Sequence, residues 1–344
     1  MPRPFLLLCL AAALCAADPA PAVITKLSDK PGATGNSFET AFVLTDSVDG
    51  IQFVVEDAKS QNTLTLKYGT YTVVYGDPNS VDYLRGKNLE EAGDFAKAAE
   101  TYRRAAGNAK YAWVKEQSLL RGTQSALQAK QLDTAIELSS ILEKEAPRSV
   151  ELDDALLLRG QAQIAKGDTA GAGKTFATLA AMAKDWGESA AVLGARGQAS
   201  VLIADKKFAE AADVLTKLLA RIGEGKNTPE LAILRLDLAE ALVAAGKGDE
   251  ALKLLPEIAY RDVGGNLQAR AHLLWARIQA TKADTAALLD AFDHAALADA
   301  TKGAETATLT EARQIAAAIV DKLAKDPAVS AADKAEYKKN LGNF

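Results

Sequence analysis

The chain has 344 residues, of which 49% are hydrophobic, 25% are charged and only 6% are aromatic. These proportions are typical of a folded protein, and the length accommodates two ordinary domains or one repeat array with an accessory module. The formal net charge of −5 lacks the basic excess that nucleic-acid-binding proteins and binders of anionic membranes require, so we expect neither partner. Abundant alanine with few aromatic residues favours packed helices over a large sheet.

The first residues have the pattern of a targeting segment. Arg3 provides a positive charge, residues 5–14 form an apolar run of roughly ten residues, and small residues end at Ala17. We therefore predict a signal peptide over residues 1–17 and an exported protein of the periplasm or the extracellular space. The alternative is cleavage a few residues later, near Ala22. An N-terminal helix of the fold is a competing interpretation, which the prolines that follow disfavour.

Both cysteines, Cys9 and Cys15, lie in this segment, so the mature chain would hold no disulfide. A lipid attached at Cys15 is a further alternative. Bacterial lipoprotein signals carry a small residue directly before that cysteine, and Leu14 departs from this pattern, which argues against a lipid anchor. No later apolar stretch is long enough to cross a bilayer, so we predict no transmembrane segment.

Two segments precede the helical part of the chain. Residues 18–40 are rich in Pro, Gly, Ser and Asp without periodicity, which predicts a flexible leader. Residues 41–78 predict a small β-module, because short runs of β-branched and aromatic residues alternate with turn dipeptides such as Asp49-Gly50. The expected strands are residues 41–44, 51–55, 64–68 and 71–75.

Six copies of one helical hairpin are predicted over residues 79–300. In each copy a polar turn is followed by an alanine, and these alanines recur at intervals of 36 to 40 residues. They are Ala98, Ala135, Ala172, Ala211, Ala251 and Ala287. Such a period indicates a solenoid, so the expected fold is mainly α, an α-solenoid of about six hairpins behind a small β-strand module. Residues 301–344 lose the register, and we expect capping helices there, near residues 308–324 and 331–340.

The hairpins resemble tetratricopeptide repeats (TPRs). The first copy fits best, with Gly86 in its first helix and Ala98 and Tyr102 in its second. The third copy repeats the pattern with Gly160 and Phe176. Small residues at these positions let two helix backbones approach, and a bulky neighbour fills the adjacent groove.

The later copies depart from the TPR pattern. All copies are longer than the consensus of about 34 residues. The sixth copy has Trp275 where a small residue is usual, and Ala291 and His294 replace the aromatic–alanine pair. Other helical arrays with longer periods therefore stay open for this half of the chain. The order of a β-module and then a Gly-Asp-Phe hairpin is similar to the layout of exported bacterial TPR proteins.

The resemblance implies a concave groove lined by the first helix of each hairpin, which binds a protein or peptide without catalysis. Carried over by register, the groove residues are Tyr83, Lys87, Gln117, Gln124, Gln128, Asp154, Gln161, Arg196, Ser200, Glu240, His272 and Gln279. Amide, hydroxyl and charged groups of this kind supply both donors and acceptors for an extended peptide backbone. The alternatives are a plain solvated helix face, self-association through the array ends, and a structural or carbohydrate-facing envelope component whose β-module does the binding.

The sequence offers no catalytic, cofactor or metal site. Residues 168–175 end in Gly-Lys-Thr like a phosphate-binding loop, but Asp168 stands where that loop needs glycine, and a helix rather than a strand precedes it. His272 and His294 are the only histidines, and no cysteine would remain after cleavage. Zinc sites of the usual kind and a cysteine nucleophile are therefore not expected. We interpret both histidines as structural, with His294 directed toward packing.

Overall fold

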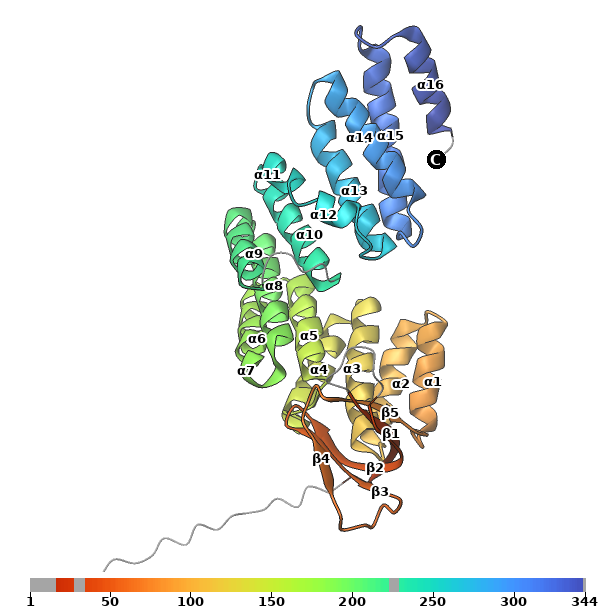
Figure 1. The fold of residues 1–344 in the computed structure, drawn as a ribbon, viewed down its shortest axis with the longest axis vertical. Helices are drawn as coiled ribbons and strands as arrows, with labels where there is room; N and C mark the ends of the chain where they lie inside the picture. Colours follow the sequence, from red (N-terminus) through yellow and green to blue (C-terminus); the bar gives the residue numbers. More distant parts are fainter. Residues whose placement is uncertain (1–16, 28–34, 223–228, 343–344) are drawn as a thin grey trace, which may run out of the picture. The chain divides into compact units, whose positions relative to one another are not determined.

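The computed structural model describes residues 17–27, 35–222 and 229–342 (Figure 1). The predicted signal peptide, with both cysteines, lies outside these residues except for Ala17. By their internal contacts the residues divide into two units, one up to Ala191 and one from Val192 onward. Within the described ranges, no helix is both long enough and apolar enough to cross a membrane.

The first unit opens with a five-stranded antiparallel sheet in the order β4-β3-β2-β1-β5. The strands are β1 (Ala20–Lys26), β2 (Ser37–Ser47), β3 (Gly50–Val55), β4 (Leu64–Leu66) and β5 (Tyr71–Tyr75). The four expected strands are confirmed. The prediction of a flexible leader over residues 18–40 is wrong, because β1 lies within it and pairs with both β2 and β5.

The pattern of β1 explains why it was missed. Ala22 and Ile24 are buried on the inner face of the sheet, and Val23 between them is exposed on the outer face. This alternation is typical of a strand, but the prolines around it favoured a loop. Pro21 is tolerated because it lies at the beginning of the strand, where proline is least disruptive.

Helices make up the rest of the first unit, and hydrogen-bonded side chains fix where several of them begin. They are α1 (Val81–Glu91), α2 (Phe95–Gly107), α3 (Ala112–Gln128), α4 (Leu132–Glu145), α5 (Leu152–Lys166), α6 (Thr169–Ala181) and the short α7 (Ala183–Trp186). Ser80 caps α1 and Asp168 caps α6, each by accepting a bond from a first-turn amide. The first three hairpins are thus α1–α2, α3–α4 and α5–α6.

The second unit continues with α8 (Glu188–Ala204), in which the division between the units falls. It holds α9 (Phe208–Ile222), α10 (Pro229–Ala244), α11 (Gly248–Leu252), α12 (Pro256–Ala259), α13 (Gly265–Ala280), α14 (Thr285–Ala300), α15 (Thr306–Lys325) and α16 (Ala331–Leu341). Within the described ranges α1 to α14 form six hairpins, in agreement with the expected number, and α15 and α16 follow them. In the fifth hairpin the second helix is broken into α11 and α12.

The first and third hairpins close where a glycine meets a large aromatic ring. A Cβ atom placed on Gly86 would lie 2.7 Å from the Tyr102 ring, and one on Gly160 would lie 2.2 Å from the Phe176 ring. Only glycine therefore allows this approach of the two helices. The turns also repeat, because equivalent positions adopt left-handed backbone whether or not the residue is glycine. These positions are Gly93, Lys130, Gly167, Lys206 and Gly246.

The sheet packs beside the loops that join the first three hairpins. The Tyr75 ring stacks on the Trp113 ring at 4.8 Å. The amide of Val48, in the β2–β3 turn, donates to the carbonyl of Arg148, in the α4–α5 loop, at 3.1 Å. Tyr83 on α1 shares a core cluster with Ala20 and Tyr75 of the sheet, whereas Val81 at the beginning of the helix is 84% exposed.

Candidate functional site

All twelve residues expected to line the groove lie on the first helices of their hairpins. Seven are in the first unit, on α1, α3 and α5, and five are in the second unit, on α8, α10 and α13. Nine of them fall into three groups according to what their side chains already contact, and the other three share no single environment. Only one of these groups is free to bind a partner.

The first group links neighbouring hairpins. The Gln117 side chain donates to Glu151, and Arg196 pairs with Asp237 at 2.6 Å. Glu240 pairs with Arg270 at 2.8 Å. Partners in each pair are about one repeat apart in the sequence, so these bonds lie between successive first helices. We correct the expectation that these side chains are available to a ligand, because their polar groups are already bonded within the array.

The second group packs between helices, with Tyr83 and His272 buried and Gln279 half-buried. Tyr83 is 7% exposed and packs edge-on against Tyr102 and Trp113, with ring centroids 6.0 and 5.7 Å away. His272 is 5% exposed and contacts His294. Gln279 donates to Asp290 at 2.6 Å. The expectation that Tyr83 and His272 face a partner is wrong, because both rings complete the packing between helices.

The third group is open to solvent. Gln124, Gln128 and Gln161 are exposed, and their amides have no hydrogen-bond partner among the described residues. They lie on α3 and α5, which pack side by side. Gln124 and Gln161 are one repeat apart, so they hold equivalent positions in consecutive hairpins.

Three further expected residues are less distinctive. Asp154, at the beginning of α5, is exposed, whereas Lys87 on α1 is half-buried. Ser200 on α8 is exposed, but its hydroxyl donates to the carbonyl of Arg196 within the same helix. We call the surface formed by Gln124, Gln128, Asp154 and Gln161 the α3–α5 face.

Acidic groups gather where the sheet meets this face, which the sequence did not predict. A bulge in β2 turns Asp46 to the inner side of the sheet, where it accepts hydrogen bonds from the hydroxyls of Tyr71 and Tyr75. Glu116 on α3 accepts one from Ser149 at 2.6 Å. Burial raises the pKa of Glu116 to about 7.

Raised carboxyl pKa values are also found at the beginning of α5. Burial, with the neighbouring Asp154 carboxylate, raises the pKa of Asp153 to about 6. Tyr68, in the β4–β5 turn, has its hydroxyl pKa raised by burial and then by Asp153. Residues from the sheet, α3 and α5 thus form an acidic joint, in which burial raises the pKa of the carboxyl groups. Nothing local in the sequence marks it, because its members are up to about a hundred residues apart.

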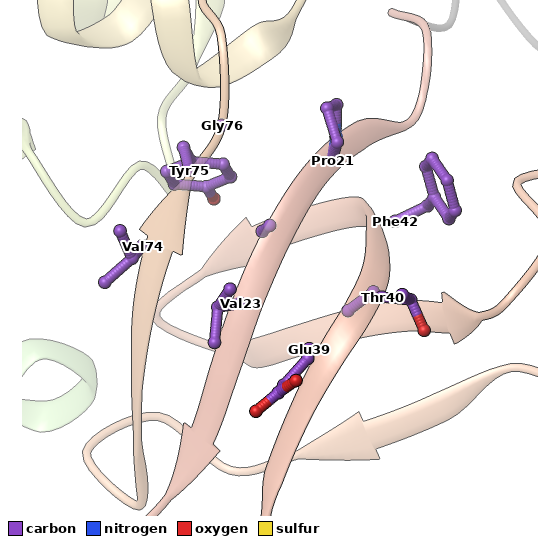
Figure 2. Close-up of a pocket in the computed structure, with 10 residues that line it drawn as sticks. Pro21, Val23, Glu39, Thr40, Phe42, Val74, Tyr75 and Gly76 are labelled. Carbon is purple, nitrogen blue, oxygen red and sulfur yellow. The ribbon is translucent and has the colours of Figure 1, made fainter.

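The outer face of the sheet carries a shallow apolar groove of about 370 Å³ (Figure 2). Pro21, Val23, Phe42 and Val74 line it, and Val74 is 67% exposed. Glu39 contributes the charged side chain of its lining. Carbohydrate recognition needs several convergent hydrogen-bonding groups, so this groove fits an apolar contact better than a sugar.

The segment that imitates a phosphate-binding loop is helical. Residues 169–175 form the beginning of α6, and the Asp168 carboxylate accepts the hydrogen bond from the amide of Gly171. The amide that a phosphate would need is therefore already occupied by a carboxylate. Among the described residues there is no group of three His, Cys, Asp or Glu side chains placed to hold a metal ion.

A stack of helical hairpins closed by small–large contacts defines an α-solenoid of the TPR type. The family model for the tetratricopeptide repeat matches residues 202–278, in the half of the chain where the pattern is most degenerate. A comparison with curated proteins gave no match. The match covers residues 202–278 and shows a TPR there, and TPR arrays generally serve as scaffolds for protein–protein interaction.

Two solved structures illustrate the likeness. A tetratricopeptide repeat protein from Parabacteroides merdae is 16% identical, with a TM-score of 0.51 over 68% of this chain and 82% of that one. A thermophilic TPR protein from Thermus thermophilus is 17% identical, with a TM-score of 0.45 over 58% of this chain and 98% of that one. At these identities the likeness concerns the fold alone.

Proposed function

We propose that this protein is a non-enzymatic scaffold of the bacterial cell envelope that holds an extended segment of a partner protein on the α3–α5 face. The supporting observation is the pair of equivalent, unbonded amides at Gln124 and Gln161. Each amide can donate to and accept from a peptide backbone. Repetition of the same group at one-repeat spacing suits an extended chain that crosses successive hairpins.

The experiment is crosslinking and capture from the envelope fraction, comparing the wild-type protein with Gln124→Ala/Gln161→Ala. Gln314 on α15 is also an exposed glutamine with no described hydrogen-bond partner, so Gln314→Ala is the matched control. We expect one partner protein to be captured by the wild type and the control and lost from the double variant. Equal capture by all three proteins would refute the proposed face.

The apolar groove on the sheet supports a second candidate function, in which the β-module makes the contact. Val74 is the most exposed apolar side chain of this groove, so Val74→Glu should leave the fold intact and disturb only what binds there. Loss of capture by Val74→Glu, with full capture by the glutamine double variant, would favour this candidate.

Export is part of the proposal, and the fold favours one of the two cleavage sites. Cleavage near Ala22 would remove the first residues of β1, including Ala20, which pairs with Val43. Cleavage after Ala17 leaves β1 whole, so we propose that site. N-terminal sequencing of the mature protein from a fractionated cell should begin at Asp18, and a full-length chain in the cytoplasm would contradict export.

A further inference from the structure

A buried pair of histidines lies inside the sixth hairpin, in the second unit, and contacts the end of the fifth hairpin at Ala259 and Tyr260. His272 on α13 and His294 on α14 are 5% and 3% exposed, and their Nδ1 atoms lie 2.8 Å apart. The Trp275 ring stacks on the His294 ring at 4.2 Å, with 11° between the planes. The Tyr260 ring lies edge-on to His272 at 5.4 Å.

This contact needs at least one neutral imidazole, whose Nδ1 atom can accept a hydrogen bond. One Nδ1 then carries a proton and donates it, and the other accepts it. The His272 ring also hydrogen-bonds to the backbone of Ala259, the last residue of α12. If both rings were charged, two N–H groups would face each other at 2.8 Å and neither could accept.

The surroundings can compensate at most one positive charge. Asp290 on α14 faces the pair, with its Oδ1 atom 3.7 Å from His294 Nε2. The other oxygen of Asp290 already accepts bonds from Trp275 and Gln279. Tyr260 supplies the remaining titratable group that faces the pair, a neutral hydroxyl.

The arginines of α13 are bonded to other helices. On α13, Arg270 pairs with Glu240 of α10, and Arg277 pairs with Glu311 of α15. Burial lowers the pKa of both imidazoles, and that of His294 falls to about 4. The geometry and the burial thus agree that charge is disfavoured here.

The pair fixes the irregular part of the fifth hairpin. The helix α12 has only four residues, and Tyr260, which follows it, is 60% exposed. Tyr260 is held by its ring contacts to His272, Trp275 and His294. We propose that the His272–His294 pair is an acid-sensitive latch, which holds α12 and Tyr260 on the sixth hairpin at neutral pH and releases them in an acidic medium.

The test is amide hydrogen exchange of residues 256–262 at pH 7.5 and pH 5.0, corrected for the intrinsic effect of pH on exchange. Consider a histidine that has the ordinary pKa of 6.5 in the open state and stays neutral in the closed state. Lowering the pH from 7.5 to 5.0 then raises the equilibrium constant for opening about 30-fold. We expect a rise of about 30-fold or more. The same change should be absent from α5 and α6, whose residues include no histidine.

The matched variant is His272→Gln/His294→Gln, which removes every histidine of the chain. Its opening constant should no longer depend on pH in this segment. The same pH dependence in the variant and the wild type would overturn the latch. If the variant fails to fold, NMR of the wild type decides, since the chain has two imidazole signals to follow. Both should stay neutral at pH 6, and a midpoint near 6.5 in the closed protein would refute the proposal.

Discussion

Adding one methyl group at Gly160 should damage the third hairpin more than any surface substitution. The new Cβ atom of Gly160→Ala would lie 2.2, 2.4 and 2.7 Å from three atoms at the tip of the Phe176 ring. Ordinary contact begins at 3.4 Å, so the ring or the helix must move by about 1 Å. Phe176 is fully buried, so a shift of its ring must disturb the side chains packed around it.

The expected cost follows from two opposing terms. Overpacking of a core costs about 1–3 kcal/mol, and the higher helix propensity of alanine returns about 0.5–1 kcal/mol. We therefore expect Gly160→Ala to lower the free energy of unfolding by about 1–2 kcal/mol. Gly173→Ala on α6 is the matched control, because nothing lies within 4 Å of its new Cβ atom. It should raise the free energy of unfolding by about 0.5–1 kcal/mol.

The assay is urea unfolding followed by circular dichroism, with the two variants also made in a Phe176→Leu background. Leucine is shorter than the ring, so Gly160→Ala should cost at least about 1 kcal/mol less there. The effect of Gly173→Ala should be the same in both backgrounds. A Gly160→Ala variant as stable as Gly173→Ala, or a cost unchanged by Phe176→Leu, would refute the steric explanation of the glycine.

Three further predictions concern single side chains. Lys206 holds a left-handed backbone (φ 60°), so Lys206→Gly should raise the free energy of unfolding by about 1 kcal/mol in the same urea assay, and a loss would contradict the strain. The pKa of Glu116 is raised in the folded state, so its stabilising contribution is complete below pH 4.5 and is lost as pH rises through about 7. The free energy of unfolding should therefore fall by about 1–3 kcal/mol between pH 5 and pH 8, and Glu116→Gln should abolish that part of the pH dependence. Arg148 pairs with Asp49 of the sheet, so Arg148→Ala should speed proteolysis of the β2–β3 turn, whereas unchanged cleavage would show that the backbone bond of Val48 holds the turn alone.

The sequence alone determined the features that depend on local pattern. The alanine period predicted six hairpins. The turns and helix caps lie at the polar and glycine residues of the sequence, because each depends only on residues a few positions apart. Gly86 and Gly160 were correctly interpreted as points of close approach. Four strands followed from their composition. The fifth, β1, was missed because its prolines suggest a loop, and only pairing with β2 and β5 makes it a strand.

Tertiary structure decided which predicted groove residues are free. Gln117 and Gln124 are both glutamines on α3, yet one is bonded to Glu151 of the next hairpin and the other is exposed. The position of a residue on a helix predicts the direction of its side chain. It does not predict whether that side chain is already hydrogen-bonded to a residue of the next repeat. The contact between His272 and His294 and the acidic joint around Glu116 have the same origin. They depend on residues distant in the chain, and only packing of the helices and the sheet brings such residues together.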